Sequence, residues 1–164
     1  MILTPAQLAA DCLKIEEKAY EYQPAVAPLI TVLHLTGCRQ GEVLDRARWS
    51  LQLDDSWILY PQKGNSPRVI PAQSVPLAFK AWVLGSGYPF KLSSLTNLRR
   101  ITDLLSLYPL ARCGDKEIST HRFRHNYAKK LSIGGASIAE IKADLGLSST
   151  AVTSGYVNSV ITSD

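Results

Sequence analysis

Apolar residues near the start of the chain recur at the spacing of an amphipathic helix. Thr4 followed by Pro5 is a typical helix start, because threonine can cap the first turn and proline fits its first position. The apolar face that follows, with steps of four, three and four residues, consists of Leu8, Cys12, Ile15 and Ala19. A second apolar segment covers 25–36 and is stopped by Gly37, and a third, short helix is expected to begin near Arg39.

The residue types change to those of β-strands between 49 and 71. Segments 56–60 (Ser-Trp-Ile-Leu-Tyr) and 68–70 (Arg-Val-Ile) are rich in β-branched and aromatic residues, and they flank the turn-forming run Lys-Gly-Asn-Ser-Pro at 63–67. This pattern predicts an antiparallel hairpin that has Lys63 in its turn.

Helical periodicity returns after the hairpin, over 74–84 and 95–107, with a surface loop expected at 85–89. Three further helices are predicted toward the end of the chain, with caps at Thr120, Ser137 and either Ser148 or Ser149, and with ends near Gly134, Leu145 and Tyr156. The predicted fold is therefore mainly α with a small antiparallel β-sheet (α+β).

The composition is that of one globular domain. The chain has 164 residues, of which 46% are hydrophobic and 20% charged, and no run approaches the ~18 apolar residues of a membrane span. Because no basic region with an apolar signal core precedes the first helix, we expect a cytoplasmic location. Three widely spaced cysteines indicate neither a disulfide framework nor a zinc site. The net charge of +4 fits a polyanionic partner but is too common to identify one.

Candidate chemistry begins with His121 and Arg124, which lie three residues apart on a predicted helix and so project from one face. This spacing is common by chance, and alone it is typical of a solvated basic helix face. The pair becomes more informative because three other features occur in the same chain. They are Thr-Gly-Cys-Arg-Gln-Gly-Glu at 36–42, Lys63 in its β-turn, and Leu-Gly-Leu at 145–147. The last residue of this third segment precedes Tyr156 by nine positions.

The ordered combination closely resembles the catalytic domain of the tyrosine recombinase family, which includes the phage-type integrases and relatives that resolve chromosome dimers. The resemblance extends over nearly the whole chain, through Leu-Thr-Pro-Ala-Gln at 3–7, Thr-Gly-x-Arg-x-x-Glu at 36–42, Lys-Gly-…-Arg-Val-Ile-Pro at 63–71, and His-Arg-Phe-Arg-His at 121–125 followed by Tyr156. Each segment is a weak signal, and their order makes the combination specific.

The resemblance implies a site-specific DNA recombinase or integrase that needs no cofactor or metal. Tyr156 is then the nucleophile that forms a 3′-phosphotyrosine and releases a 5′-hydroxyl. Arg39 and Arg124 are implied to bind the scissile phosphate, because guanidinium forks match its oxygens. His121 is the implied acid–base partner of the tyrosine, and Lys63 is the group implied to protonate the leaving 5′-oxygen.

The same resemblance implies double-stranded DNA as the partner and a recombinase tetramer assembled on it. Basic residues that could contact the DNA backbone are Arg68, Arg122 and Lys129. We expect residues 1–164 to form a single catalytic domain without the N-terminal core-binding domain of the family, either as an excised domain or as a natural short form. The tail after Tyr156 is expected to be either truncated or docked in cis.

Other polar residues of these segments have structural interpretations. Glu42 is implied to orient Arg39 or to cap neighbouring backbone, and His125 is expected to buttress the site or the core. His34 stands between two leucines and is expected to be a core histidine with a hydrogen-bond partner. Tyr127 has two open interpretations, one of which buries it against the first pair of helices.

One position departs from the family pattern. Leu147 stands where the family usually has histidine or tryptophan, and leucine cannot donate a hydrogen bond to phosphate. We therefore expect slow strand cleavage that increases in Leu147→His, or alternatively a family member that has lost catalysis and only binds DNA. Segment 138–152 also fits the helix-turn-helix of a transcriptional regulator, which leaves Arg39 and Lys63 without a role.

Overall fold

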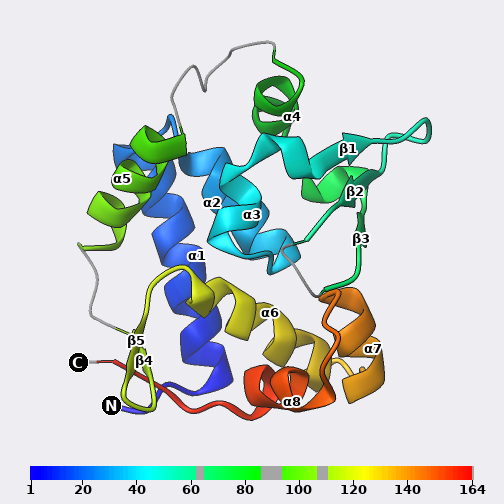
Figure 1. The fold of residues 1–164 in the computed structure, drawn as a ribbon. Helices are drawn as coiled ribbons and strands as arrows, with labels where there is room; N and C mark the ends of the chain where they lie inside the picture. Colours follow the sequence, from blue (N-terminus) through cyan, green and yellow to red (C-terminus); the bar gives the residue numbers. More distant parts are fainter. Residues whose placement is uncertain (62–64, 86–93, 107–110, 164) are drawn as a thin grey trace.

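The computed structural model describes residues 1–61, 65–85, 94–106 and 111–163. Its helices are α1 (Pro5–Tyr22), α2 (Ala27–Thr36), α3 (Gln40–Leu44), α4 (Leu77–Val83), α5 (Ser94–Leu105), α6 (His121–Ile133), α7 (Ile138–Asp144) and α8 (Thr150–Asn158), with short 3₁₀ turns η1 (Arg46–Arg48) and η2 (Ala72–Ser74). Its strands are β1 (Trp49–Leu51), β2 (Trp57–Leu59), β3 (Arg68–Ile70), β4 (Ala111–Cys113), β5 (Lys116–Ile118) and β6 (Ile161–Ser163). The predicted class, mainly α with a small antiparallel β-sheet, is confirmed, and a second small sheet is present (Figure 1).

Helices α1, α2 and α6 pack against one another near the centre of the molecule (Figure 1). α1 begins as predicted, with a capping box in which Thr4 Oγ1 accepts from the Gln7 amide and Gln7 Oε1 accepts from the Thr4 amide. The predicted apolar face is buried, and each of its side chains is at most 1% exposed. The face consists of Leu8, Cys12, Ile15 and Ala19. Burial of this face against its neighbours stabilises the helix.

The sharp turn after α2 depends on a glycine. α2 ends at Gly37, whose left-handed backbone has a φ of 63°. The ring of Tyr127 lies directly against it, because an added Cβ would be 2.7 Å from ring carbon atoms of Tyr127. Both the backbone conformation and this contact require glycine. The turn leads to Arg39, which immediately precedes the predicted short helix α3.

The predicted hairpin belongs to a three-stranded antiparallel sheet of order β1-β2-β3. β2 and β3 form the hairpin, with Trp57 opposite Ile70 and Leu59 opposite Arg68, and β1 adds a strand on the other side of β2. The hairpin strands are thus confirmed. Its predicted turn residue, Lys63, lies outside the described residues.

A second antiparallel sheet, of order β5-β4-β6, is missing from the sequence prediction. Strands β4 (Ala-Arg-Cys) and β5 (Lys-Glu-Ile) have few of the β-branched and aromatic residues that mark the first hairpin. β6 belongs to the tail after Tyr156, and it pairs with β4 so that Ile161 lies opposite Cys113. In this structure the tail therefore docks in cis, one of the two alternatives left open by the sequence.

The last three helices begin at the predicted residues, with one difference in capping. Side chains of Ser137 and Ser149 accept backbone amide hydrogen bonds at the starts of α7 and α8. Thr120 occupies the cap position of α6, but its hydroxyl is bonded to Gln40 Oε1 at 2.9 Å instead of to the helix. This bond ties the start of α6 to α3.

Buried apolar side chains form two clusters. The smaller lies among α6, α7 and α8 and contains Ala128, Ile141, Leu145 and Leu147, and Tyr156 packs against it. The larger cluster fills the rest of the molecule. Within the described ranges, no helix is both long and apolar enough to cross a membrane.

Candidate active site

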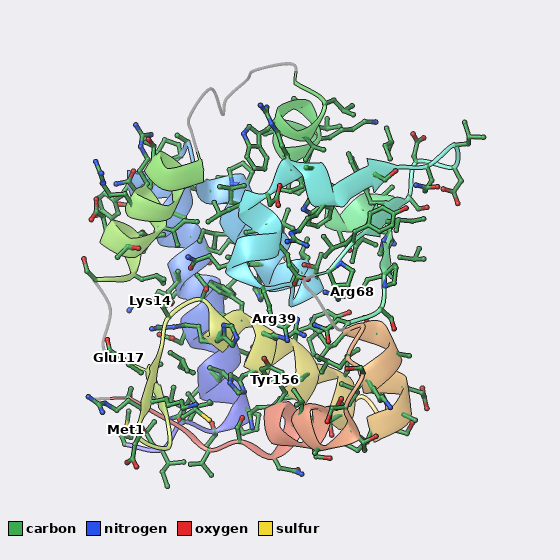
Figure 2. All side chains as sticks on the ribbon, viewed as in Figure 1. Met1, Lys14, Arg39, Arg68, Glu117 and Tyr156 are labelled. Atoms are coloured by element: carbon green, nitrogen blue, oxygen red, sulfur yellow. The ribbon has the colours of Figure 1, made fainter. Side chains whose placement is uncertain are left out.

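Four residues predicted to be catalytic meet beside the first half of α6. Arg39 precedes α3, His121 and Arg124 lie about one turn apart on α6, and Tyr156 lies on α8, which packs along α6 (Figure 2). The other residue of the predicted set, Lys63, lies outside the described residues. The structure therefore brings together the phosphate-binding and nucleophilic positions of the predicted set.

Basic side chains of α6 line one side of the Tyr156 ring. The Cζ atom of Arg124 lies 4.9 Å from the centroid of this ring, which is within cation–π range. The imidazole centroids of His125 and His121 lie 5.0 and 6.2 Å from the same centroid. Tyr156 packs against the smaller apolar cluster, which holds its position. Its side chain is only half-buried and therefore stays partly accessible.

Arg124 is almost fully buried, with 1% exposure. Its Nη1 donates to the carbonyl oxygen of Gly37 at 2.7 Å. Its Nε and Nη2 are also buried, and neither has a hydrogen-bond partner among the described residues. Leaving buried donors unused destabilises a fold. Two such donors on one guanidinium group match the oxygens of a phosphate or carboxylate.

Burial and repulsion between cations lower the pKa values of Arg124 and His121. Burial lowers the pKa of Arg124, the neighbouring Tyr156 opposes this, and the charges of Arg39 and Arg68 lower it further. Arginine nevertheless stays protonated in proteins. Burial also lowers the pKa of His121, and the charges of Arg124 and Arg39 add to the effect. His121 is therefore mainly neutral at pH 7 and can accept a proton.

His125 supports the end of α8 that includes Tyr156. The side chain is 6% exposed, and its Nδ1 lies 2.7 Å from Ser159 Oγ and 3.5 Å from the carbonyl oxygen of Tyr156. Burial lowers the pKa of His125 to about 4, so the imidazole is neutral at pH 7. The predicted buttressing role is confirmed. Ser159 contributes to it, although nothing in the sequence distinguishes this serine from the others.

Glu42 supports the turn at Arg39. Its side chain is buried, and its Oε1 accepts from the Arg39 amide at 2.7 Å. Its backbone carbonyl accepts from Trp49 Nε1 at 2.8 Å, which fixes α3 against the first sheet. The negative charge of Glu42 also raises the pKa of His121, partly offsetting the cations around it. Glu42 therefore has the structural place that the resemblance implied.

The three residues predicted to contact the DNA backbone have partners inside the protein. Arg68 and Arg122 are 3% and 2% exposed, and Arg122 Nη1 donates to Asp11 Oδ2 at 3.0 Å. Lys129 Nζ donates to two backbone carbonyl oxygens at the end of α8, at 3.2 and 2.6 Å. A cation held in this way is less available to a phosphate backbone. Contact of these side chains with DNA stays a prediction.

Leu147, the position that departs from the family pattern, is part of the apolar core. It is 5% exposed and belongs to the smaller apolar cluster, against which Tyr156 packs. Its side chain offers apolar contact and no hydrogen-bond donor. At the position where the family pattern has a polar group, this chain therefore has an apolar side chain in the cluster against which Tyr156 packs.

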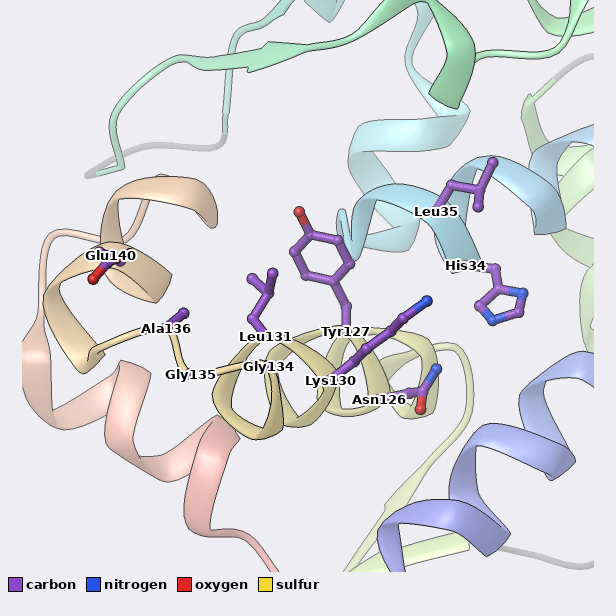
Figure 3. Close-up of a pocket in the computed structure, with 10 residues that line it drawn as sticks. All are labelled: His34, Leu35, Asn126, Tyr127, Lys130, Leu131, Gly134, Gly135, Ala136 and Glu140. Carbon is purple, nitrogen blue, oxygen red and sulfur yellow. The ribbon is translucent and has the colours of Figure 1, made fainter.

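A cavity of about 560 Å³ lies beside the second half of α6 and includes none of the predicted site residues. Figure 3 shows its lining, which comes from α2, α6, the turn before α7 and α7 itself. The lining residues are His34, Leu35, Asn126, Tyr127, Lys130, Leu131, Gly134, Gly135, Ala136 and Glu140. His34 Nδ1 is hydrogen-bonded to the carboxylate of Glu16, which confirms the predicted partner. The predicted core location is wrong, because the side chain is half-buried and lines the cavity. The cavity is thus separate from the tyrosine site.

Sequence comparison finds tyrosine recombinases, although no family model matches the chain. The chain is 27% identical over 148 residues to tyrosine recombinase XerD of Chlorobaculum tepidum, a match that covers 79% of this chain and 47% of the relative. It is 26% identical over 152 residues to tyrosine recombinase XerC of Bifidobacterium longum, covering 80% and 42%. The chain therefore spans about half the length of the curated relatives it matches.

Two solved structures share the fold. The crystal structure of XerA recombinase aligns with a TM-score of 0.59 and 22% identity, over 90% of this chain and 58% of that one. A lambda integrase(75-356) dimer bound to a COC′ core site aligns with a TM-score of 0.62 and 19% identity, over 92% of this chain and 58% of that one. Both comparisons confirm the predicted resemblance, since this chain is similar in sequence to tyrosine recombinases and has the fold of their catalytic domain.

Proposed function

We propose that this chain is the catalytic part of a site-specific DNA recombinase that cleaves and rejoins strands through a 3′-phosphotyrosine at Tyr156. The guanidinium group of Arg124 supports this most directly, because it is buried beside the Tyr156 ring with two donors unused among the described residues. A phosphodiester bound to these donors would lie next to the tyrosine. The curated relatives are tyrosine recombinases, and the lambda integrase neighbour is bound to a core site.

The proposed reaction exchanges one phosphate ester for another. Arg124 and Arg39 hold the non-bridging oxygens of the scissile phosphate and stabilise the charge that develops on them. The Oη atom of Tyr156 bonds to phosphorus while the bond to the 5′-oxygen breaks, which leaves a 3′-phosphotyrosine and a free 5′-hydroxyl. Because the energy of the ester is retained, attack by a 5′-hydroxyl reseals the strand without another energy source.

Two proton transfers accompany cleavage. A free tyrosine has a pKa of about 10 and is rarely ionised at neutral pH, so its proton needs an acceptor. His121 is the proposed acceptor, because burial lowers the pKa of its imidazole and keeps it neutral. Lys63 is the proposed donor to the leaving 5′-oxygen, on the basis of the family resemblance. In rejoining, the two transfers run in reverse.

Further parts of the proposal concern the assembly. Double-stranded DNA is the proposed substrate, and a tetramer on DNA, working in the cytoplasm, is the proposed active form. Residues 1–164 are proposed to act as one catalytic domain. The net charge of +4 supports association with DNA in general but specifies no sequence.

A second candidate function is DNA binding without catalysis. Leu147 favours it, because this apolar side chain stands where the family usually has a phosphate donor. A helix-turn-helix regulator is less well supported. Such a function gives no role to Arg39 or to the unused donors of Arg124 beside the Tyr156 ring.

Covalent capture on DNA separates these functions. Purified protein would be incubated with nicked suicide duplexes of randomised sequence, from which the short cleaved end diffuses away and leaves the adduct trapped. We expect an adduct that survives denaturation for the wild type and for Tyr60→Phe, which changes an exposed tyrosine, but none for Tyr156→Phe. Peptide mass spectrometry would locate the nucleotide on Tyr156. Wild-type protein that retards DNA in a native gel without forming an adduct would refute the enzyme and favour the binding function.

A further inference from the structure

A buried arginine outside the proposed catalytic set joins three elements. Arg68 lies on β3 and is 3% exposed. Its Nε donates to the carbonyl oxygen of Asp144 at 2.6 Å, and its Nη2 donates to the carbonyl oxygen of Thr36. Nη2 also forms an ion pair with the Asp144 carboxylate at 3.6 Å. One side chain thus connects β3 to the ends of α7 and α2.

The contact with Thr36 places Arg68 against the turn that leads to Arg39. The carbonyl oxygen of Thr36 accepts from Arg68, and the next carbonyl oxygen, that of Gly37, accepts from Arg124 at 2.7 Å. Hydrogen bonds to charged donors are stronger than neutral ones, and here two of them hold successive peptide groups. The backbone from which Arg39 extends is therefore fixed by two buried guanidinium groups.

Tyr127 and Asp144 complete what we call the Arg68 cluster (Arg68, Tyr127 and Asp144). Tyr127 Oη donates at 2.6 Å to Asp144 Oδ1, the oxygen that pairs with Arg68. Burial raises the pKa of Tyr127 and the bond to Asp144 raises it further, so its hydroxyl remains a donor. Its ring stands out from α6 and packs against Gly37 (Figure 3). The cluster therefore touches the turn through both a hydrogen bond and an aromatic ring.

Arg68 also lies close enough to Arg124 for their charges to interact. Its positive charge lowers the pKa of Arg124, which indicates that the two guanidinium groups interact electrostatically. Its Nη1 is buried and has no hydrogen-bond partner in the part of the chain that the structure describes. An anion bound by Arg124 would therefore experience the charge of Arg68 as well.

We propose that the Arg68 cluster is a positioning unit, which holds the turn 36–39 so that Arg39 and Arg124 reach the same phosphate group. This inference rests on the proposed function and deepens it. It also replaces the predicted contact of Arg68 with the DNA backbone. In the new assignment Arg68 binds the protein and acts on the phosphate through Arg39 and Arg124.

A charge-neutral substrate distinguishes positioning from a general loss of structure. In methylphosphonate DNA a methyl group replaces one charged non-bridging oxygen, so cleavage depends less on guanidinium groups. In Arg68→Met we expect cleavage of phosphodiester DNA to fall on the order of 100-fold, as for a misplacement of about 1 Å, and cleavage of methylphosphonate DNA to fall much less. Arg39→Met should give the same pattern. Arg68→Lys keeps the charge without the fork and should lie between the wild type and Arg68→Met.

Arg122→Met is the matched control, because Arg122 is equally buried and ion-paired but bonds to Asp11 and not to the turn. Any loss in this variant should be equal on the two substrates. Tyr127→Phe is a milder probe should Arg68→Met not fold, since it removes only the bond to Asp144. It should give the Arg68→Met pattern at reduced size. Equal losses on both substrates in the Arg68 and Tyr127 variants would overturn the proposal.

Cys38 reports on the turn independently of catalysis. Its thiol is 1% exposed, and its amide donates to Thr36 Oγ1 at 3.2 Å. Burial raises the pKa of the Cys38 thiol to about 11, so alkylation requires the turn to open. We expect peptide mapping to show faster alkylation of Cys38 in Arg68→Met and the wild-type rate in Arg122→Met.

DNA cleavage and Cys38 alkylation together distinguish failure of the positioning proposal from failure of the proposed function. A wild-type rate of Cys38 alkylation in Arg68→Met would mean that Arg68 does not hold the turn, whatever the cleavage data. If the wild type forms no DNA adduct, the proposed function fails, and the alkylation rate still decides whether the cluster fixes the turn. Faster alkylation together with a loss confined to the charged substrate is the result that supports positioning.

Discussion

Arg122 and Arg124 lie two residues apart on α6 and are buried to a similar degree, yet their surroundings differ. Arg122 donates from Nη1 to Asp11 Oδ2 at 3.0 Å and from Nε to the carbonyl oxygen of Ser119 at 2.9 Å. Arg124 has one carbonyl partner, and its Nε and Nη2 have none among the described residues. At about 100° per residue, such positions point to opposite sides of a helix. One arginine therefore faces α1 and the other faces the tyrosine.

This difference separates a structural buried charge from one prepared for a ligand. Taking a guanidinium group out of water costs several kcal/mol, and Arg122 offsets this with a carboxylate and a carbonyl group. Arg124 has no such carboxylate partner within the described ranges. Donors that are buried, fixed and unused are what stabilises the charge developing on a reacting phosphate. The motif at 121–125 contains both arginines, and the sequence alone cannot tell their roles apart.

Arg124→Met should abolish most cleavage and spare the fold. We expect adduct formation on suicide DNA to fall on the order of 1000-fold, because the phosphate loses a bidentate donor in a buried site. The free energy of unfolding in urea should change by less than about 1 kcal/mol, since the lost bond to Gly37 is offset by removal of an incompletely paired charge. A large loss of stability with little loss of cleavage would assign Arg124 the structural role that we give to Arg122.

His125 provides a pH test of the side of α6 that faces the tyrosine. Burial lowers the pKa of His125 to about 4 in the folded protein, against about 6.5 for a histidine in an unfolded chain. A pKa lowered by folding contributes stability that is complete above pH ~6.5 and is lost as the pH falls toward ~4. We expect protonation of His125 to lower the free energy of unfolding by up to about 3 kcal/mol, measured by urea unfolding across this pH range.

The variant His125→Gln isolates this contribution from that of other groups, including His121, whose pKa burial also lowers. Between pH ~6.5 and ~4 its free energy of unfolding should decline less steeply than that of the wild type. Parallel profiles for the two proteins would show that His125 can be protonated without cost in the folded state. It would then not be the neutral support of Tyr156 that its burial indicates.

Arg122→Met should lower stability and leave cleavage per folded molecule within about threefold of the wild type. The change leaves the carboxylate of Asp11 without its ion-pair partner. We expect the free energy of unfolding to fall by about 2 kcal/mol, which is less than for a fully buried pair because the Asp11 side chain is 25% exposed. Urea unfolding measures this loss. In a double-mutant cycle with Asp11→Asn, the combined loss should be smaller than the sum of the single losses. Additive losses would show that the two residues are not an energetic pair.

The helices are predictable from the sequence because their signals are local. The cap at Thr4, the stop at Gly37 and the cap at Ser137 each act within one turn of the helix they bound. The second sheet is different, because β4 pairs Ala111 with Ser163 across a large separation in sequence. Pairing between such distant segments leaves no local signature in the sequence, whereas β2 and β3 flank a turn-forming run.

In the site, residue types are predictable and hydrogen-bond partners are not. The motif order locates the residues that gather around Tyr156, but a basic residue after a turn looks the same whether its guanidinium group points outward or inward. Arg68 points inward because its acceptors at Asp144 and Thr36, which are 76 and 32 residues away, are brought to it only by the fold. That distance explains why the sequence assigns Arg68 to DNA.

Leu147→His should have the smallest effect and tests the apolar support beneath Tyr156. An imidazole at this position adds a donor to the cluster against which the tyrosine packs, and we expect single-turnover adduct formation to rise about tenfold. Because Leu147 is 5% exposed, burying a polar ring there should lower the free energy of unfolding by about 1 to 2 kcal/mol. Leu147→Met, which keeps the packing without a donor, should leave the rate unchanged. If Leu147→His is no faster than Leu147→Met, the introduced ring stays in the core, and the phosphate depends on Arg124 and Arg39 without a donor at position 147.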